Sequence, residues 1–171
     1  IPVCLHDSTI NRTARNLDGT ELSSTIAIND ITYNDLLNYD FGIWKSSAYA
    51  GTPIPKFEDF IILCRNLGLH PYIEIKSSDT YTESQIQMLV DIVRKNGMKN
   101  KVSWISFNNT YLTYVKNYDS HARLGYIVGT VGSYAITNAL ALKTANNEVF
   151  IDASDYSNNA VTLCYNAELP L

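Results

Sequence analysis

Residues 55–77 read PKFEDFIILCRNLGLHPYIEIKS, and this stretch decides the fold. Its first part begins at Pro55, ends at Gly68 and places its apolar side chains on one face at helical spacing. Its second part, from Leu69 onward, has the composition of a strand. A helix followed at once by a strand is the repeating step of parallel sheets that are covered by helices.

The same alternation continues to the end of the chain. It predicts strands near residues 3–6, 69–76, 101–107, 123–128 and 148–153, and further helices near 82–97, 109–118, 133–146 and 157–168. The fold class is therefore α/β of the (β/α)8 TIM-barrel type, here a partial barrel of about five strands, because a closed barrel needs eight strands and typically about 250 residues. The last residues, AELPL, resemble the lead-in to another strand.

Residues 8–54 form a polar, turn-rich segment that interrupts this alternation of helices and strands. One short helix is expected there, beginning at Thr32 with Asp35 three residues on. Barrel enzymes place their active-site loops after the carboxyl ends of strands. We therefore expect a single partial barrel domain over residues 1–171, with 8–54 as an insertion on the active-site side.

Composition excludes several classes of protein. The 171 residues are 46% hydrophobic and carry a net charge of −4, which argues against a nucleic-acid partner. No apolar run approaches the roughly 20 residues of a membrane-spanning helix. The three cysteines lack CxxC spacing and lie in apolar runs, so buried free thiols are expected. Reduced thiols favour a cytoplasmic protein, although any signal peptide would precede residue 1.

The strand at 72–76, YIEIK, carries charge where a parallel sheet is normally apolar. Tyr72, Glu74 and Lys76 share one face because side chains alternate along a strand. Two interpretations remain open. Glu74 and Lys76 form a structural ion pair at the strand end, or they lie at the mouth of a site where Glu74 binds a cation and Lys76 an anion.

A second candidate lies at residues 3–12, VCLHDSTINR, where an apolar run ends in His6 and Asp7. A lone histidine at a strand end is more often structural than catalytic. At the same sheet edge as Lys76, however, His6 would suit phosphate ester chemistry, because imidazole transfers protons near neutral pH. His70 and His121 are expected to be structural or solvated.

Several segments together resemble one family, the glycerophosphodiester phosphodiesterases. The segments that carry the resemblance are IPVCLHDSTINRTARNLDGT, TPIPKFEDFI, PYIEIKS, VSWISFN and RLGYIVG, in family order along nearly the whole chain. The resemblance implies a (β/α)8 barrel that hydrolyses glycerophosphodiesters to glycerol 3-phosphate and an alcohol. It also implies a divalent cation, Ca²⁺ or Mg²⁺.

Carried over residue by residue, the resemblance assigns four roles. His6 matches the second of two acid–base histidines, and Asp7 matches the aspartate that orients it. Glu74 matches a metal ligand, and Lys76 matches a basic residue near the phosphate.

The chain also departs from the family pattern. The His-Arg-Gly of the family's first strand and the Glu-x-Asp of its second strand are not in this sequence, and neither is the later Trp-Thr strand. The chain therefore resembles the middle of a barrel enzyme, and we expect it to be inactive alone. Open sheet edges also favour association into a homo-oligomer.

Two other functions remain open. One is a non-catalytic binding or structural module derived from the barrel, and the other is a sister phosphodiesterase such as a phosphatidylinositol-specific phospholipase C. The Glu-Ile-Lys and His-Asp segments favour the glycerophosphodiester enzymes over this sister group. An in-frame His-Arg-Gly and Glu-x-Asp in the DNA upstream of Ile1 would distinguish a truncated enzyme from a module.

Overall fold

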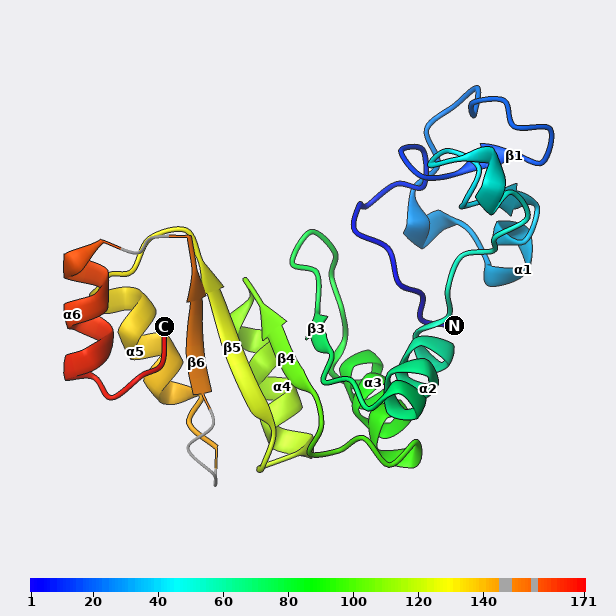
Figure 1. The fold of residues 1–171 in the computed structure, drawn as a ribbon. Helices are drawn as coiled ribbons and strands as arrows, with labels where there is room; N and C mark the ends of the chain where they lie inside the picture. Colours follow the sequence, from blue (N-terminus) through cyan, green and yellow to red (C-terminus); the bar gives the residue numbers. More distant parts are fainter. Residues whose placement is uncertain (145–148, 155–156) are drawn as a thin grey trace. The chain divides into compact units, whose positions relative to one another are not determined.

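The computed structural model describes residues 1–144, 149–154 and 157–171. Two compact units make up the chain, Ile1–Phe60 and Ile61–Leu171 (Figure 1). A single domain over residues 1–171 stays a prediction.

The first unit is mostly loop, held by a small apolar core and short elements. Its buried core residues are Ile10, Ala14, Leu36 and Ile54. The elements are β1 (Arg15–Asn16), the 3-10 helix η1 (Ile28–Asp30), α1 (Tyr33–Leu36), β2 (Tyr39–Asp40) and the 3-10 helix η2 (Ser47–Tyr49), with β1 and β2 antiparallel. The predicted short helix is confirmed, because the Thr32 side chain accepts a hydrogen bond from Asp35 N at the start of α1.

The predicted strand at residues 3–6 is wrong. Val3 forms only an isolated antiparallel bridge with Lys56, in which Cys4 N donates to the Pro55 carbonyl and Phe57 N donates to the Pro2 carbonyl. The next step of this ladder would need a donor at Pro55, and proline has no N–H. The pairing therefore ends after one bridge, and the segment joins no sheet in the described residues.

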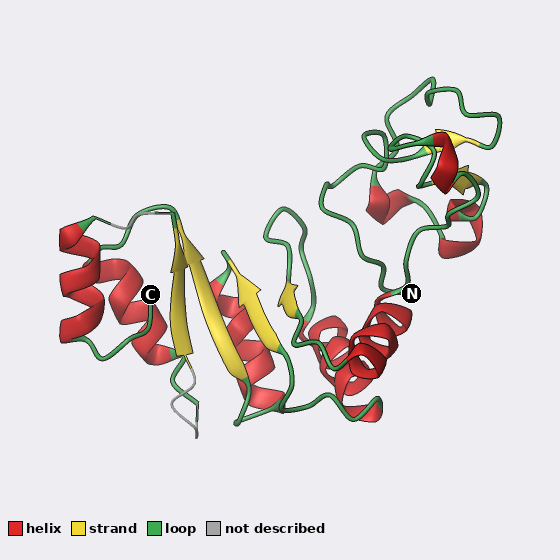
Figure 2. Cartoon of the chain, in the orientation of Figure 1, coloured by secondary structure: helices red, strands yellow, loops and turns green. Residues whose placement is uncertain are grey.

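The second unit alternates helices and strands as the sequence predicts, beginning with α2, which starts just before the unit boundary (Figure 2). The elements are α2 (Phe57–Leu67), β3 (Tyr72–Glu74), α3 (Glu83–Lys95), β4 (Ser103–Ser106), α4 (Asn109–Tyr118), β5 (Arg123–Val128), α5 (Ser133–Ala141), β6 (Val149–Ala153) and α6 (Asn158–Asn166). The expected helix over 133–146 and strand over 148–153 each include residues outside the described ranges, at 145–146 and 148. The capping box of α3 is present, with Thr82 and Gln85 bonded reciprocally.

The four strands form one parallel sheet in the order β3-β4-β5-β6. One face is packed with buried side chains such as Ile73, Trp104, Leu124 and Ile151. Contacts of α4 and α5 with the strands show that helices cover the sheet. The described sheet thus has four strands rather than five, because residues 3–6 do not join it.

The other face of the sheet carries a contact between its two edge strands. The rings of Tyr72 on β3 and Phe150 on β6 meet edge to face, with centroids 6.1 Å apart. Three strand spacings of about 4.8 Å would separate them by roughly 14 Å in a flat sheet. The rings therefore lean toward each other over this face, where Gly125 leaves room for the Phe150 ring.

The end of the chain pairs with the last strand. Pro170 O accepts a hydrogen bond of 2.9 Å from Ile151 N, and Leu169 is buried. These residues follow α6 and lie beside the β6 edge at this point. The interpretation of AELPL as the lead-in to a strand stays a prediction.

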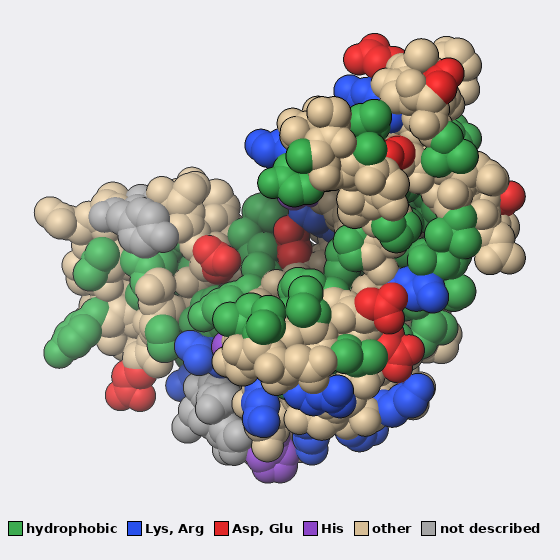
Figure 3. Space-filling view, turned by 45° about the vertical axis from the view of Figure 1, so that its right-hand side comes forward, with side chains coloured by type: hydrophobic (Ala, Val, Ile, Leu, Met, Phe, Trp, Pro, Cys, Tyr) green, Lys and Arg blue, Asp and Glu red, His purple; other side chains and the backbone are tan. Residues whose placement is uncertain are grey.

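Two of the three cysteines are buried, as the sequence predicts, and the third is not fully buried. None of the three cysteines forms a disulfide, and Cys64 and Cys164 are buried whereas Cys4 is only half-buried. No helix in the described part of the chain combines the length and apolar character that crossing a bilayer requires. Figure 3 shows side chains of both charges interspersed with hydrophobic ones on the face that it draws.

Candidate active site

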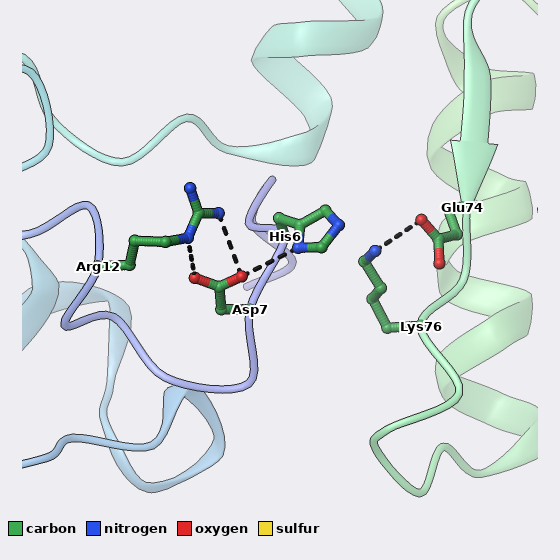
Figure 4. A network of polar contacts seen from close by, with 5 residues as sticks. All are labelled: His6, Asp7, Arg12, Glu74 and Lys76. Atoms are coloured by element: carbon green, nitrogen blue, oxygen red, sulfur yellow. Dashed lines mark hydrogen bonds and ion pairs between the residues drawn. The ribbon is translucent and has the colours of Figure 1, made fainter. Parts of the chain in front are cut away.

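His6, Asp7 and Arg12 form a hydrogen-bonded cluster in the first unit (Figure 4). His6 Nδ1 lies 2.9 Å from Asp7 Oδ1. Arg12 binds the same carboxylate with two nitrogens, Nε at 2.5 Å from Oδ2 and Nη2 at 3.1 Å from Oδ1. The His6 side chain is 75% exposed and the Asp7 side chain is 26% exposed. The imidazole ring is therefore open to solvent, whereas the aspartate that it contacts is partly buried.

Two backbone bridges hold this cluster in place. The Val3–Lys56 bridge lies before His6 and Asp7, and the Thr9–Ala27 bridge lies between them and Arg12. Ile10 follows, fully buried in the core of the first unit. His6 and Asp7 therefore sit on a short turn whose two ends are both fixed.

The electrostatics of the cluster keep Asp7 ionised. Hydrogen bonds from Arg12 and then from His6 lower the pKa of the Asp7 carboxyl from 3.8 to about 2. At neutral pH this carboxylate can only accept hydrogen bonds. The cluster therefore presents an imidazole with a fixed anionic partner, which is an arrangement suited to proton transfer.

Glu74 and Lys76 form the second candidate pair, at the carboxyl end of β3 (Figure 4). Lys76 Nζ donates to Glu74 Oε2 over 2.6 Å, and the two side chains are 22% and 27% exposed. Ile73 and Ile75 are buried on the opposite side of the strand. Glu74 and Lys76 therefore lie on the same face of the strand, as the sequence predicts. Their ion pair is consistent with this placement.

The described residues do not by themselves fit a divalent cation. Ca²⁺ and Mg²⁺ take about six or more oxygen ligands. No group of three or more histidine, cysteine, aspartate or glutamate side chains gathers within the described ranges in a way that could hold a metal. This pair offers a cation one carboxylate, which already holds the Lys76 ammonium group on Oε2.

The remaining histidines have local structural partners, as predicted. His70 Nε2 lies 2.9 Å from Ser103 Oγ, which ties the start of β3 to β4. His121 Nδ1 lies 3.2 Å from the Oγ of its neighbour Ser120. Neither ring is bonded to an acidic side chain in these contacts.

Arg12 is the site residue that sequence reasoning missed. The four predicted residues form two pairs, His6 with Asp7 and Glu74 with Lys76, one in each unit. Arg12 joins the first pair. Arg12 stands in the segment IPVCLHDSTINRTARNLDGT that carries the family resemblance. No role was assigned to it, because an arginine five residues after an aspartate, in a polar turn, is usually solvated.

Comparison with known proteins identifies the family. A model of the glycerophosphoryl diester phosphodiesterase family matches residues 1–164. The chain belongs to this family. A comparison with curated protein sequences gave no match.

Solved structures of this family share the fold of the chain. A candidate glycerophosphoryl diester phosphodiesterase from Silicibacter pomeroyi matches with a TM-score of 0.82 at 15% identity, over 99% of this chain and 66% of that one. A phosphodiesterase from Oleispira antarctica, solved with the product sn-glycerol-3-phosphate, matches with a TM-score of 0.73 at 19% identity, over 99% and 73%. A glycerophosphodiester phosphodiesterase from Agrobacterium tumefaciens gives 0.66 at 17% identity, over 96% and 64%.

These matches confirm the predicted fold class. The four-stranded parallel sheet with its alternating helices corresponds to part of a glycerophosphodiester phosphodiesterase barrel. The chain spans about two thirds of the length of the solved structures that it matches. At these identities the likeness establishes the fold alone.

Proposed function

We propose that this chain supplies part of the active site of a metal-dependent enzyme that hydrolyses glycerophosphodiesters to glycerol 3-phosphate and an alcohol. Membership of the family supports this proposal. The relative from Oleispira antarctica, which holds sn-glycerol-3-phosphate, indicates the class of product.

The observation that carries the proposal is the bond between His6 and Asp7. A histidine that keeps one nitrogen on a carboxylate presents the other to a substrate as an acid or base. In hydrolysis of a phosphodiester, a proton must leave the attacking water and another must reach the departing alcohol oxygen. We assign His6 to one of these transfers and Asp7 to its orientation.

We assign Lys76 to the negative charge of the phosphate and Glu74 to a cation. An ammonium group near the phosphate stabilises the negative charge that builds on phosphoryl oxygens in the transition state. Glu74 is the one described residue that we assign to a cation, and a cation would add Lewis-acid stabilisation of the same oxygens. The remaining ligands are not assigned, in line with the incomplete fit described above.

The test is hydrolysis of glycerophosphocholine in Ca²⁺ or Mg²⁺ by the protein as its gene encodes it. His6→Ala is expected to lower kcat by about 10² to 10⁴, the usual contribution of a positioned acid or base. His121→Ala, which removes an exposed histidine bonded only to its neighbour Ser120 in the contacts above, is the matched control and is expected to keep the wild-type rate. Equal turnover by His6→Ala and wild type would overturn the proposal.

A separate expectation concerns the 171-residue chain on its own. We expect little or no turnover, because the described residues gather no cation cluster and His6 has no second histidine among its bonded partners. Robust metal-dependent turnover that is lost in His6→Ala would contradict this expectation while supporting the phosphodiesterase assignment. Binding of substrate without turnover by the encoded protein would instead favour the non-catalytic module.

A further inference from the structure

Arg12 holds Asp7 in a geometry that only arginine provides. Its Nε and Nη2 donate to the two oxygens of the Asp7 carboxylate at 2.5 and 3.1 Å. Such a two-point contact fixes the plane of the carboxylate as well as its position. A lysine would supply the charge but only a single point of contact.

The fixed carboxylate in turn determines which nitrogen of His6 carries the proton. Asp7 is ionised at neutral pH, so in the 2.9 Å contact it must accept and His6 Nδ1 must donate. With its proton on Nδ1, a neutral imidazole has its lone pair on Nε2. Oδ1 of Asp7 is shared by His6 and by Arg12 Nη2, so a shift of the guanidinium changes the partner of the ring directly.

We propose that Arg12 is a positioning residue that fixes the Nδ1–H tautomer of His6 through Asp7, so that Nε2 is the atom that exchanges the proton with substrate. This inference rests on the acid–base role proposed for His6. It gives Arg12 a task different from direct binding of the phosphate, because both of the nitrogens named above are already committed to Asp7.

The tautomer is measured by ¹H–¹⁵N correlation spectra of the histidine rings in the full chain. The spectra are recorded at about pH 8.5, two units above the ordinary histidine pKa of about 6.5. Wild type is expected to show His6 with a protonated Nδ1 and an unprotonated Nε2. Arg12→Gln is expected to give a mixture of tautomers, and Arg12→Lys an intermediate result. Arg94→Gln, which breaks an arginine–aspartate contact that involves no histidine, is the control.

Kinetics of the encoded protein separate positioning from substrate binding. Arg12→Gln is expected to lower kcat about 10- to 100-fold with KM nearly unchanged, as a misplaced catalytic group does. A rise in KM with unchanged kcat would overturn the inference and make Arg12 a phosphate-binding residue. An unchanged His6 tautomer in Arg12→Gln would overturn it as well.

The outcome also separates this inference from the proposed function. Suppose that Arg12→Gln gives a mixture of His6 tautomers while His6→Ala hydrolyses the substrate at the wild-type rate. The proposed function then fails, and the control of the His6 tautomer by Arg12 stands. If His6→Ala is inactive while Arg12→Gln keeps both tautomer and rate, the proposed function stands and the inference fails.

Discussion

The Asp40 side chain binds backbone groups of a loop in the first unit. The residue is 4% exposed, and its carboxylate accepts hydrogen bonds from the backbone N–H groups of Gly42 at 2.7 Å, Ile43 at 2.9 Å and Gly51 at 2.5 Å. These bonds, that of Gly51 first, lower the pKa of the Asp40 carboxyl below 3.8. One side chain thus satisfies three backbone donors.

Asp40→Asn is expected to destabilise the chain at pH 7, because an amide offers one acceptor oxygen in place of two. A lowered folded-state pKa means that the ionised carboxylate contributes its full stability above the unfolded pKa. This contribution is lost as pH falls through the folded pKa. The difference in urea midpoint between wild type and Asp40→Asn should therefore be largest near neutral pH and shrink below about pH 4.

Asp30→Asn, a substitution at an exposed aspartate in η1, is the control and should not reproduce this pH profile. A midpoint difference between wild type and Asp40→Asn that stays constant down to about pH 2 would contradict the account.

At the scale of elements, local patterns predicted the helices and strands of the second unit well. The α3 helix begins at its capping box and ends before Gly97, which adopts a φ of +71°. Residues 3–6 have a strand-like composition, but Pro55 in the facing segment blocks the ladder, and no pattern within 3–6 reveals this partner. For the same reason the contact of Arg12 with Asp7 was not predicted, since it depends on the fold of the turn between them.

Gly125 supports the contact between the two edge strands. A Cβ there would collide with the Phe150 ring and would lie 2.8 Å from Ile105 Cγ2. Phe150 meets Tyr72 edge to face and has the Arg123 guanidinium 5.4 Å from its ring centre. Only a glycine at position 125 allows the Phe150 ring to keep this position.

Gly125→Ala is expected to lower the free energy of unfolding by about 1 to 3 kcal/mol, because the ring must leave its contacts or the strands must part. The measurement is urea unfolding, with Gly129→Ala, where a Cβ would meet nothing within 4 Å, as the control. The loss should be smaller when Phe150 is already replaced by leucine, since the collision with the ring is then removed and only the contact with Ile105 remains. Equal losses in both backgrounds would contradict this explanation.

At the scale of the molecule, the two edges of the main sheet differ. The edge at β6 is partly covered by the end of the chain, through the bond of Ile151 N to Pro170 O. The edge at β3 has β4 as its single neighbour in the described sheet, and Tyr72 on it is 54% exposed. Exposed edge strands favour pairing with another chain.

The chain is therefore expected to associate at micromolar concentration, and light scattering measures this. Tyr72→Lys places a charge on the edge strand and should shift the chain toward monomer. Tyr165→Lys, at an 82% exposed position on α6, is the control. A clean monomer of wild type that binds no hydrophobic dye would rule out association.

The most direct test of the proposed active site is a titration of the chain with sn-glycerol 3-phosphate, followed by the NMR signals of the His6 ring and the Lys76 side chain. If both residues serve one phosphate site, their signals should move with a common midpoint, and Lys76→Gln should abolish both changes. Movement of Lys76 alone, or two different midpoints, would contradict the assignment of His6 and Lys76 to one active site.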